Sequence, residues 1–593
     1  MTTQAATVII KESARPHTDR KLNAQVLVTA FGIFLLSVLV YSTVLYDTPF
    51  FTRGEAREAL VVESMVQKRD LVLPITNAGQ ISAKPPLFHW IAVGLSHLTG
   101  EADESTIRLV SALAAGLALS LFFIFVASVS NIPVAWGTVC ILGTAIEWFR
   151  AGTHARVDGC LALGITWAAC SFYWSLRRHT EKGEASWIWL LSAGFGIALA
   201  ILSKGPMGLA IPCAIIGIYW LASAGYPYLQ ALRTFPYLSH SVAILLGGAL
   251  AGTWYFLAYQ HLPDEFFKVH VVNENLARFM EVPDYEPGHR KPFYFGPIYL
   301  FTAFLPWTLL LPVLFCWFRH GSWRSESALF ATVWAGTVIA MGCIASAKRS
   351  VYFLPAFPPL AFLLALAIEE AIRDPNFFRR AVAIGRTMLF ILFGIAAIAV
   401  TLSFTFVVSD SVADFIADRG VIREKDATVV GIVREVLGSA SLLGALLPLL
   451  LLGIFFGAYW FRGSELKKSL IAISSTIVVG GLAIGLAFVR DYSRAVEPSA
   501  FMRTLESRVP ADAEIYQYQD TYFAVTYYGD RFMPRAETVD LSSQTAQYFL
   551  VEGKREEEFL TVSPNSELVF EGEEFTANAK GRLKVFRVQS EKR

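Results

Sequence analysis

The sequence predicts an α-helical polytopic membrane protein with about thirteen transmembrane helices and a small C-terminal α/β domain outside the cytoplasm. Hydrophobic residues make up 54% of its 593 residues and charged residues only 17%, and the mean hydropathy is +0.48. Soluble domains contain about 45–50% apolar and about 25% charged residues. The composition therefore excludes a purely water-soluble enzyme and a disordered chain.

Each predicted membrane span is a window of about 20 apolar residues, because a helix of that length crosses the hydrocarbon core. The first span follows a polar leader, residues 1–23, and no small-residue cleavage site follows it, so we expect it to remain as an anchor. The spans and their loops form one predicted membrane domain, residues 24–489. The windows are 24–45, 105–128, 131–148, 159–176, 187–203, 206–223, 240–259, 296–317, 327–345, 351–371, 387–408, 439–461 and 469–489.

Positive charge predicts the orientation, because cytoplasmic loops are enriched in Lys and Arg. With the N-terminus in the cytoplasm, short connections rich in these residues lie inside, among them those with Arg177, Arg233, Arg319, Arg379 and Lys467. An odd number of spans then places the C-terminus outside. The outer face also receives the long connections 46–104, 260–295 and 409–438.

The last hundred residues, 490–593, differ from the rest in their polarity and patterning. SAFMRTLESRV predicts an amphipathic helix, and AEIYQYQ, QYFLVEG, ELVFEGEEF and LKVFRV predict strands. TYFAVTYYG fits a short helix or a strand. This tail contains no nucleophile motif, phosphate loop or metal-ligand spacing, so we expect it to support the fold or recognise an acceptor.

Charge and cysteine content exclude further classes. The chain has 50 Lys and Arg against 49 Asp and Glu, a net charge of +1, which gives no reason to expect a nucleic acid partner. All six cysteines lie in apolar segments, and none lies in the polar tail. A disulfide framework and a thiolate zinc site are therefore not expected.

Several cations lie at the predicted outer edge of the membrane. Lys204 interrupts two apolar spans in SKGP, Lys348 and Arg349 do so in SAKRS, and Arg57 and Lys84 lie in the first outer loop. A cation near hydrocarbon costs about 2.5–3.5 kcal/mol on insertion scales, so the group predicts an anionic partner. The alternative is that these side chains reach lipid head groups or pair with nearby carboxylates.

Two carboxylates accompany these cations in separate outer loops, 46–104 and 149–158. Glu55 begins a predicted interfacial helix over 55–67, and Asp158 stands at the start of an apolar span. Cations could hold a phosphate leaving group while a carboxylate accepts the proton of an attacking hydroxyl. For each carboxylate, stabilisation of a helix start is the alternative. His89 and His154 lie nearby without a third ligand, so no metal is assigned to them.

An ordered set of motifs covers more than half of the chain, residues 24–371. It resembles the bacterial GT-C membrane glycosyltransferases, which include the lipid A aminoarabinose transferase and bacterial relatives of the dolichyl-phosphate-mannose protein mannosyltransferases. Each motif is weak alone, and the order makes the set specific for the superfamily but not for a substrate. The motifs are GEAREALVVESM, LVLP, KPPLFHW, ARVDG, LSKGPMGLAIP, NLARF, PFYFGPIYLFTAFLPW and SAKRSVYFLPAFPPLA.

The resemblance implies transfer of a sugar from a polyprenyl phosphate to an acceptor on the outer face, with inversion at the anomeric carbon. It also implies that Lys204, Lys348 and Arg349 join Arg57 and Lys84 around the donor phosphate. Tyr294 and Tyr352 would line the donor groove, although placement in an interfacial aromatic belt is the alternative.

The chain departs from the family pattern at two positions. Relatives usually have an AspGlu pair where this chain has Gly54-Glu55, so either Glu55 or Asp158 is the candidate base. Ala83 replaces a Glu that often precedes LysProPro, which leaves the contribution of a divalent cation open. The implied partners are a polyprenyl-phosphate-sugar donor, a lipid or protein acceptor and membrane lipids, in the bacterial inner membrane.

Three other functions fit parts of the sequence. A carrier of lipid-linked sugars or other anionic lipids would place charge near the membrane midplane and show paired repeats, whereas the charge here gathers at loop edges. An O-antigen ligase or polymerase would have a very large outer loop in the second half of its membrane region, and the connection 409–438 is too short for this. A non-catalytic scaffold would tolerate substitution of the outer-loop residues. The sequence does not identify the sugar or the acceptor.

Overall fold

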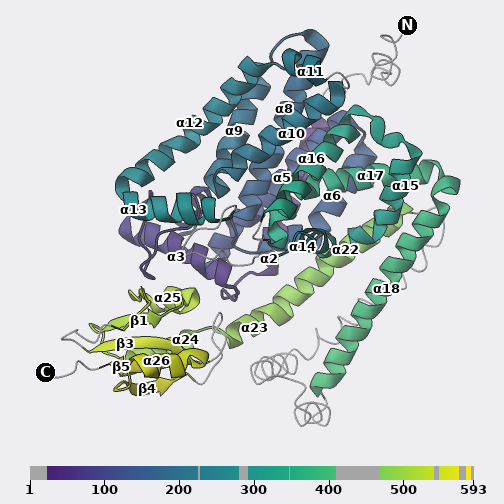
Figure 1. Cartoon of the computed structure of the whole chain (residues 1–593). Coiled ribbons are helices and arrows are strands. Elements are labelled where there is room, and N and C mark those ends of the chain that lie inside the picture. Colours follow the sequence, from purple (N-terminus) through teal and green to yellow (C-terminus); the bar gives the residue numbers. More distant parts are fainter. Residues whose placement is uncertain are drawn as a thin grey trace, which may run out of the picture.

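The computed structural model describes residues 23–224, 228–278, 291–345, 348–408, 466–539, 546–572 and 582–588. They form a bundle of long helices and, beyond one end of it, a small sheet with short helices (Figure 1). Within the described residues, eight helices are long and apolar enough to cross a membrane, and up to ten spans result if each of two bent pairs counts as one. The chain is therefore a polytopic helical membrane protein.

The first half of the bundle contains two helices, α3 and α4, that form part of the predicted first outer loop. Helices α5 to α12 follow them, most of them long. The elements are α2 (Ala24–Val44), α3 (Arg53–Lys68), α4 (Leu87–Thr99), α5 (Glu104–Val129), α6 (Ile132–Thr144), α7 (Ile146–Thr153), α8 (Asp158–Lys182), α9 (Trp187–Lys204), α10 (Met207–Ala224), α11 (Tyr228–Thr234) and α12 (Tyr237–His261).

The second half begins with short helical turns and continues with longer helices. The elements are α13 (Pro263–Phe266), the π-helix η1 (Phe267–Asn273), the 3₁₀ turn η2 (Leu276–Arg278), α14 (Phe295–Ala303), η3 (Trp307–Leu310), α15 (Leu311–His320), η4 (Ser322–Arg324), α16 (Glu326–Ile344), η5 (Ser350–Ala356), α17 (Phe357–Arg373), α18 (Pro375–Val408), α22 (Leu466–Ala483), η6 (Ile484–Val489) and α23 (Arg490–Ala495).

Two of the predicted spans are broken rather than continuous. In the window 131–148, α6 and α7 meet at 68°, because Ala145 between them has an extended backbone. In the window 296–317, α14 and the segment Trp307–His320 meet at 102°, where Pro306 lacks the amide hydrogen that a continuing helix requires. The window 439–461 lies outside the described residues, so the number thirteen stays a prediction.

Small residues bring α8 and α9 into close contact. A Cβ atom added to Gly164 would lie 2.7 Å from the backbone nitrogen of Ala200, and one added to Gly196 would lie 2.6 Å from that of Ala168. Lipid tails are as apolar as the surface of a membrane helix, so the hydrophobic effect does not drive two such helices together. Close backbone contacts between small residues stabilise the pair instead. This contact holds together the two helices that present Asp158 and Lys204.

The C-terminal segment folds into a five-stranded sheet with the order β2-β1-β3-β5-β4. β1 pairs in parallel with β2 and β3, while β5 pairs antiparallel with β3 and β4. One face packs on α24 and α25 and the other on α26. The elements are α24 (Ser499–Arg508), β1 (Glu514–Tyr518), α25 (Phe523–Gly529), β2 (Arg535–Ala536), β3 (Gln547–Glu552), η7 (Gly553–Arg555), α26 (Glu556–Val562), β4 (Glu567–Glu571) and β5 (Leu583–Val588).

The sheet is attached to the first outer loop. The Tyr528 hydroxyl in α25 accepts a hydrogen bond from the Phe50 amide at 2.9 Å and donates one to Glu104 at 2.6 Å. The Met533 amide donates to the Asn77 carbonyl at 2.7 Å. In Figure 1 the sheet lies below α3, at the end of the bundle opposite α11. The tail therefore supports the loop that carries several predicted site residues.

Candidate functional site

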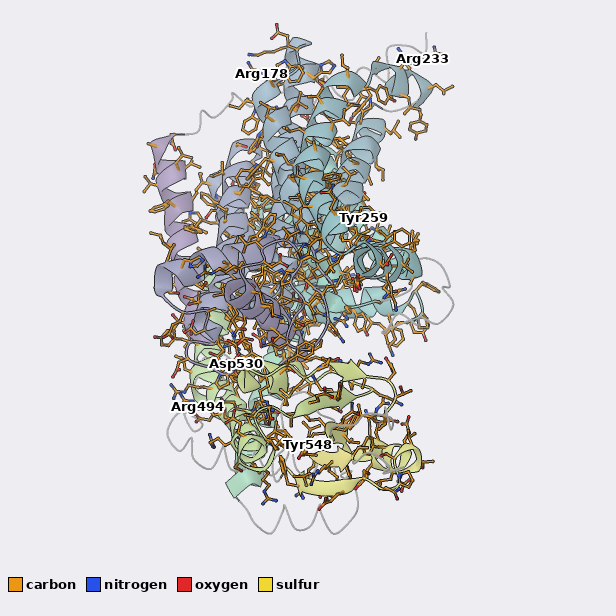
Figure 2. All side chains as sticks on the ribbon, turned by 90° about the vertical axis from the view of Figure 1, so that its left-hand side faces the viewer. Arg178, Arg233, Tyr259, Arg494, Asp530 and Tyr548 are labelled. Carbon is orange, nitrogen blue, oxygen red and sulfur yellow. The ribbon has the colours of Figure 1, made fainter. Side chains whose placement is uncertain are left out.

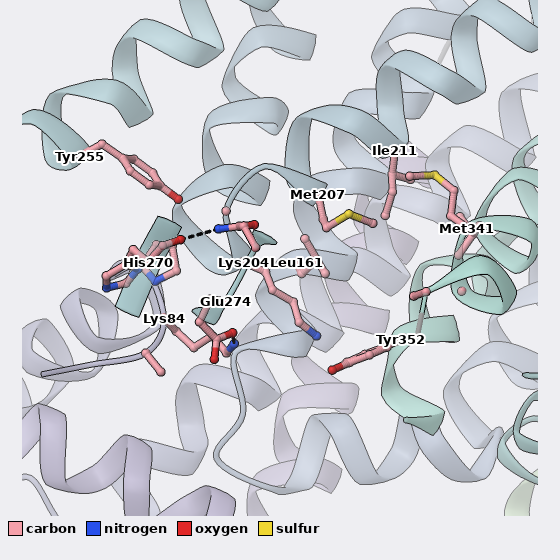
Figure 3. Close-up of a pocket in the computed structure, with 17 residues that line it drawn as sticks. Lys84, Leu161, Lys204, Met207, Ile211, Tyr255, His270, Glu274, Met341 and Tyr352 are labelled. Atoms are coloured by element: carbon pink, nitrogen blue, oxygen red, sulfur yellow. Dashed lines mark hydrogen bonds and ion pairs between the residues drawn. The ribbon is translucent and has the colours of Figure 1, made fainter. Parts of the chain in front are cut away.

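A pocket of about 890 Å³, counting its open mouth, lies between the first outer loop and the helices. Its polar lining includes Lys84 of that loop, Lys204 at the end of α9, and Glu274 after η1. Its apolar lining comes from α8, α10 and α16, and Tyr352 of η5 closes one side (Figure 3). The fold thus brings two predicted cations and one predicted tyrosine into a common cavity.

Lys204 connects the pocket to Asp158. α9 ends at Lys204 because the next residue, Gly205, has a φ of +75°, which leaves the helical conformation. The Lys204 ammonium group forms an ion pair with the Asp158 carboxylate at the first residue of α8, and both side chains are nearly buried. The same Nζ lies 4.5 Å from the centre of the Tyr352 ring. Asp158 does not itself line the pocket, but it is paired with a cation that does.

Lys84 forms the second ion pair of the pocket, with Glu274. The Lys84 amide donates a hydrogen bond to the Ser82 hydroxyl at 3.2 Å, and that hydroxyl donates to the Lys84 carbonyl at 2.9 Å. These bonds, together with the two prolines that follow, hold the loop backbone in one conformation. Both pocket lysines are thus paired with carboxylates.

Arg57 lies beside this group on α3. Its guanidinium binds the Glu58 carboxylate with distances of 3.0 Å from Nε and 2.5 Å from Nη2. Glu58 also contacts His89 Nε2 at 2.9 Å. The charge of Glu58 raises the pKa of Arg57, against the effect of burial, and the carboxylates of Glu274 and Asp158 add to this rise. Arg57 is therefore electrostatically part of the pocket, although Glu58 is its direct partner.

Glu55 has a different environment from Asp158. Its side chain is fully buried, forms an ion pair with Arg108 at 2.8 Å, and accepts a hydrogen bond from the Ala155 amide at 3.2 Å. Burial opposes ionisation of Glu55, but the positive charges of Arg108 and His154 and these hydrogen bonds outweigh it and lower its pKa to about 2. Glu55 does not line the pocket. It instead joins α3 and α5 to the segment that leads into Asp158.

The remaining predicted residues lie at different distances from the cavity. Lys348 is buried and donates a hydrogen bond to the carbonyl of Ala345, which lines the pocket. Arg349 is exposed. Tyr294 is 52% exposed, stacks on Phe295 with 5.1 Å between ring centres, and does not line this pocket. Of the two predicted groove tyrosines, only Tyr352 reaches this cavity.

Several residues of this region were not predicted from the sequence. Glu274, His270 and Asn275 line the pocket, and Arg108 neutralises Glu55. The motif NLARF begins at Asn275, so it marked this segment without indicating which side chains face the cavity. Arg108 lies within the predicted span 105–128. A cation inside an apolar span needs a charged partner, so its presence there was the signal for a buried ion pair. Within the described ranges, no three His, Cys, Asp or Glu side chains are grouped so that they could hold a metal ion.

The family model for dolichyl-phosphate-mannose-protein mannosyltransferases matches residues 83–254. Two undecaprenyl phosphate-alpha-4-amino-4-deoxy-L-arabinose arabinosyl transferases are similar over longer ranges. That of Shewanella sediminis is 26% identical over 65% of this chain and 66% of its own length, and that of Serratia proteamaculans is 29% identical over 58% and 60%. The chain thus aligns with slightly less than two thirds of the length of these relatives.

Solved structures show the same fold. The crystal structure of ArnT from Cupriavidus metallidurans bound to undecaprenyl phosphate superposes with a TM-score of 0.70 at 16% identity, covering 94% of this chain and 97% of that one. The apo form of the same protein gives a TM-score of 0.68. The resemblance inferred from the motifs is confirmed: the chain has the fold of the bacterial GT-C glycosyltransferase ArnT and is similar in sequence to the aminoarabinose transferases and the mannosyltransferase family.

Proposed function

We propose that the protein is an integral membrane glycosyltransferase that moves a sugar from a polyprenyl-phosphate donor to an acceptor on the periplasmic face. The observation that carries this proposal is the pocket in which Lys84 and Lys204 lie next to an apolar wall from α8, α10 and α16. A lipid phosphate is complementary to this pocket, because its anionic head can bind the lysines while its apolar tail contacts the apolar wall. The relatives are named for an undecaprenyl phosphate donor, and ArnT was crystallised with undecaprenyl phosphate.

In the proposed reaction, Lys84 and Lys204 bind the donor phosphate, and Arg57 contributes its charge from α3. Lys348 and Arg349 support this group from the segment after α16. Charge-assisted hydrogen bonds from these cations stabilise the negative charge that develops when the anomeric carbon–oxygen bond breaks. The electron pair of that bond leaves with the phosphate, so stabilisation of the leaving group is the main contribution of the cations.

Asp158 is our candidate for the base. In the absence of donor it pairs with Lys204. When the phosphate takes over Lys204, Asp158 becomes available to accept the proton of an acceptor hydroxyl or amine, which attacks the anomeric carbon from the face opposite the phosphate. One displacement inverts that carbon. Proton transfer to a placed base contributes about 10²–10⁴ to the rate. Glu55 acts as a positioning residue, because its carboxylate holds Ala155 and thereby the segment that carries Asp158.

The proposed topology has about thirteen spans, with a cytoplasmic leader at 1–23, a membrane domain at 24–489 and a periplasmic domain at 490–593. The distribution of charged residues along the bundle supports this orientation. Arg178 and Arg233, which we expect inside, lie at one end of the molecule, whereas Arg494, Asp530 and Tyr548 lie at the other (Figure 2). The pocket residue Lys84 belongs to the loop that contacts the sheet, on the expected outer side.

Mass spectrometry of envelope lipids and glycoproteins tests the proposal. A deletion strain should lack one sugar unit that the wild-type gene restores and Asp158→Asn does not. Asp264→Asn is the matched control, because Asp264 is an exposed carboxylate of α13 that does not line the pocket. Immunoblots of membranes would confirm equal amounts of each variant. An unchanged glycan profile, with lipid-linked precursor retained inside the cell, would contradict the proposal and favour a carrier.

A further inference from the structure

Three side chains, Arg57, Glu58 and His89, form a chain of hydrogen bonds between two helices of the first outer loop. Arg57 and Glu58 are consecutive residues of α3, and His89 belongs to α4. Glu58 is 3% exposed and His89 is fully buried, whereas the side chain of Arg57 is 35% exposed. Neither Glu58 nor His89 lines the pocket. The chain thus has a cation at its open end and an imidazole at its buried end.

The contact between Arg57 and Glu58 is unusual for neighbours on a helix. Consecutive residues of an α-helix point about 100° apart, so their side chains do not normally face each other. Here Nε and Nη2 of Arg57 both bind Oε1 of Glu58, at 3.0 and 2.5 Å. The Glu58 carboxylate is therefore turned towards its own neighbour, and a contact from outside α3 can hold it in that position.

His89 supplies that contact from α4, because its Nε2 lies 2.9 Å from Oε2 of Glu58. Burial opposes ionisation of Glu58, but the charge of Arg57 and the hydrogen bond with His89 outweigh it and lower the pKa of Glu58. An ionised carboxylate can only accept hydrogen bonds, so Nε2 of His89 is the donor. The other ring nitrogen, Nδ1, is buried without a hydrogen-bond partner among the described residues. The polar contact of this ring is thus directed at Glu58.

The open end of the chain lies within electrostatic range of the pocket. The charge of Glu58 raises the pKa of Arg57 most, and the carboxylates of Glu274 and Asp158 raise it further. These two carboxylates are the partners of the pocket lysines. Because the energy between two charges falls with their separation, the effect of Arg57 on an anion in the pocket depends on where its guanidinium is held.

We infer that His89 is a positioning residue, which acts through Glu58 to hold the guanidinium of Arg57 where its charge stabilises an anion in the pocket. His89 and Glu58 make no contact with that anion. The inference rests on the proposed function, in which the charge of Arg57 acts on the donor phosphate. Loss of the hydrogen bond from His89 frees Glu58 to turn away from Arg57, and the guanidinium then loses its fixed place.

The test measures binding of undecaprenyl phosphate to the purified full-length protein in detergent by native mass spectrometry. His89→Phe keeps a ring but removes the donor, and the amide of His89→Asn is too short to reach Glu58. His89→Gln is the rescue variant, because its longer side chain places an amide N–H near the position of Nε2. His97→Phe is the matched control, since His97 is exposed on the same helix and does not line the pocket. Thermal unfolding shows which variants are folded.

His89→Phe and His89→Asn should bind the lipid about fivefold more weakly than wild type, the order expected when a nearby charge moves by a few ångströms. His89→Gln should stay within about twofold of wild type, and the control should match it. In an Arg57→Met protein, the further change of His89 to Phe should cause no additional loss, because the effect of His89 passes through Arg57.

Three results would overturn the inference while the proposed function stands. They are unchanged binding by a folded His89→Phe or His89→Asn protein, an equal loss in His89→Gln, and an additional loss in the Arg57→Met protein. If His89→Phe and His89→Asn both fail to fold, His89 serves the fold and not the placement of Arg57, which also overturns it. Failure of the wild-type protein to bind the lipid would instead refute the proposed function, and this inference with it.

Discussion

Two carboxylates that look similar in the sequence have different surroundings in the fold. Asp158 pairs with a lysine that faces the pocket, whereas Glu55 pairs with a buried arginine and holds a backbone amide. Breaking a buried ion pair by removing one partner is strongly destabilising. At the scale of single residues, loss of Glu55 is therefore expected to destabilise the site, whereas loss of Asp158, whose partner lines the pocket, is expected to affect the rate of transfer as well.

Lys204→Met should reduce sugar transfer at least 100-fold, because it removes a phosphate ligand and leaves Asp158 without its counter-ion. The measurement is sugar transfer from the lipid donor by the purified enzyme, with protein folding checked by thermal unfolding. Lys268→Met is a suitable control, since Lys268 is exposed on η1 and does not line the pocket. Full activity of Lys204→Met would exclude Lys204 from the donor site.

Glu55→Gln should lower the free energy of unfolding by about 3 kcal/mol at neutral pH. This value follows from the pKa of Glu55, which the fold lowers from 4.5 to about 2. A carboxyl with a depressed folded-state pKa stabilises the protein above its ordinary value, and this contribution is lost as the pH falls from 4.5 towards 2. The difference between wild type and variant should therefore shrink over that range. Thermal unfolding in detergent at several pH values measures it. A difference that is independent of pH would contradict the assigned ion pair.

At the scale of elements, the first outer loop is held between the helices and the C-terminal sheet. Gly79 of this loop has a φ of +69°, and a Cβ atom there would lie 2.7 Å from Pro534 Cβ, so only glycine fits this contact. Arg53 pairs with Asp520 at 2.8 Å, and Gln67 bonds to Asp530 at 3.0 Å. The sheet thus restricts the loop that carries Arg57 and Lys84.

Tyr528→Phe should loosen this attachment, because the hydroxyl bonds both Phe50 and Glu104 and its loss leaves both partners unsatisfied. We expect a loss of about 1–3 kcal/mol in local stability. Hydrogen exchange of residues 46–104 should increase, while that of α8 and α9 should not. Tyr46→Phe is the control, since Tyr46 is 63% exposed. Unchanged exchange in the loop would show that this hydroxyl does not hold it.

At the scale of the whole molecule, the pocket and the sheet lie towards the same end of the bundle, and the predicted cytoplasmic arginines lie at the other. This arrangement fits the proposed reaction, in which the sugar is already attached to its lipid and no nucleotide is needed at the proposed outer face. The net charge of the chain is only +1 although cations gather at the pocket, because nearby carboxylates balance these cations.

Cysteine labelling in intact cells tests this orientation. In a variant in which the six native cysteines are replaced, Glu557→Cys on α26 should react with a maleimide that does not cross the inner membrane. Glu184→Cys, in the exposed connection between α8 and α9, should react only after the cells are opened. The opposite pattern would invert the proposed topology.

Much of the fold could be predicted because the signals are local. Apolar windows, the charge of short connections and strand patterns depend on neighbouring residues, and motif order depends on the chain alone. The breaks at Ala145 and Pro306 were not predicted, since hydropathy measures how apolar a segment is and not whether its backbone stays helical. Candidate site residues could be named, but their contacts could not.

The sequence by itself determined that this is a helical, multi-pass membrane protein of GT-C type, because span length and motif order are properties of the linear chain. Only the tertiary structure decided which carboxylate meets which cation. Lys84 pairs with Glu274, which is 190 positions away, and Lys204 pairs with Asp158, which is 46 positions away. The physical reason is that Coulombic and hydrogen-bond energies depend on distance in space, and packing of the helices sets that distance.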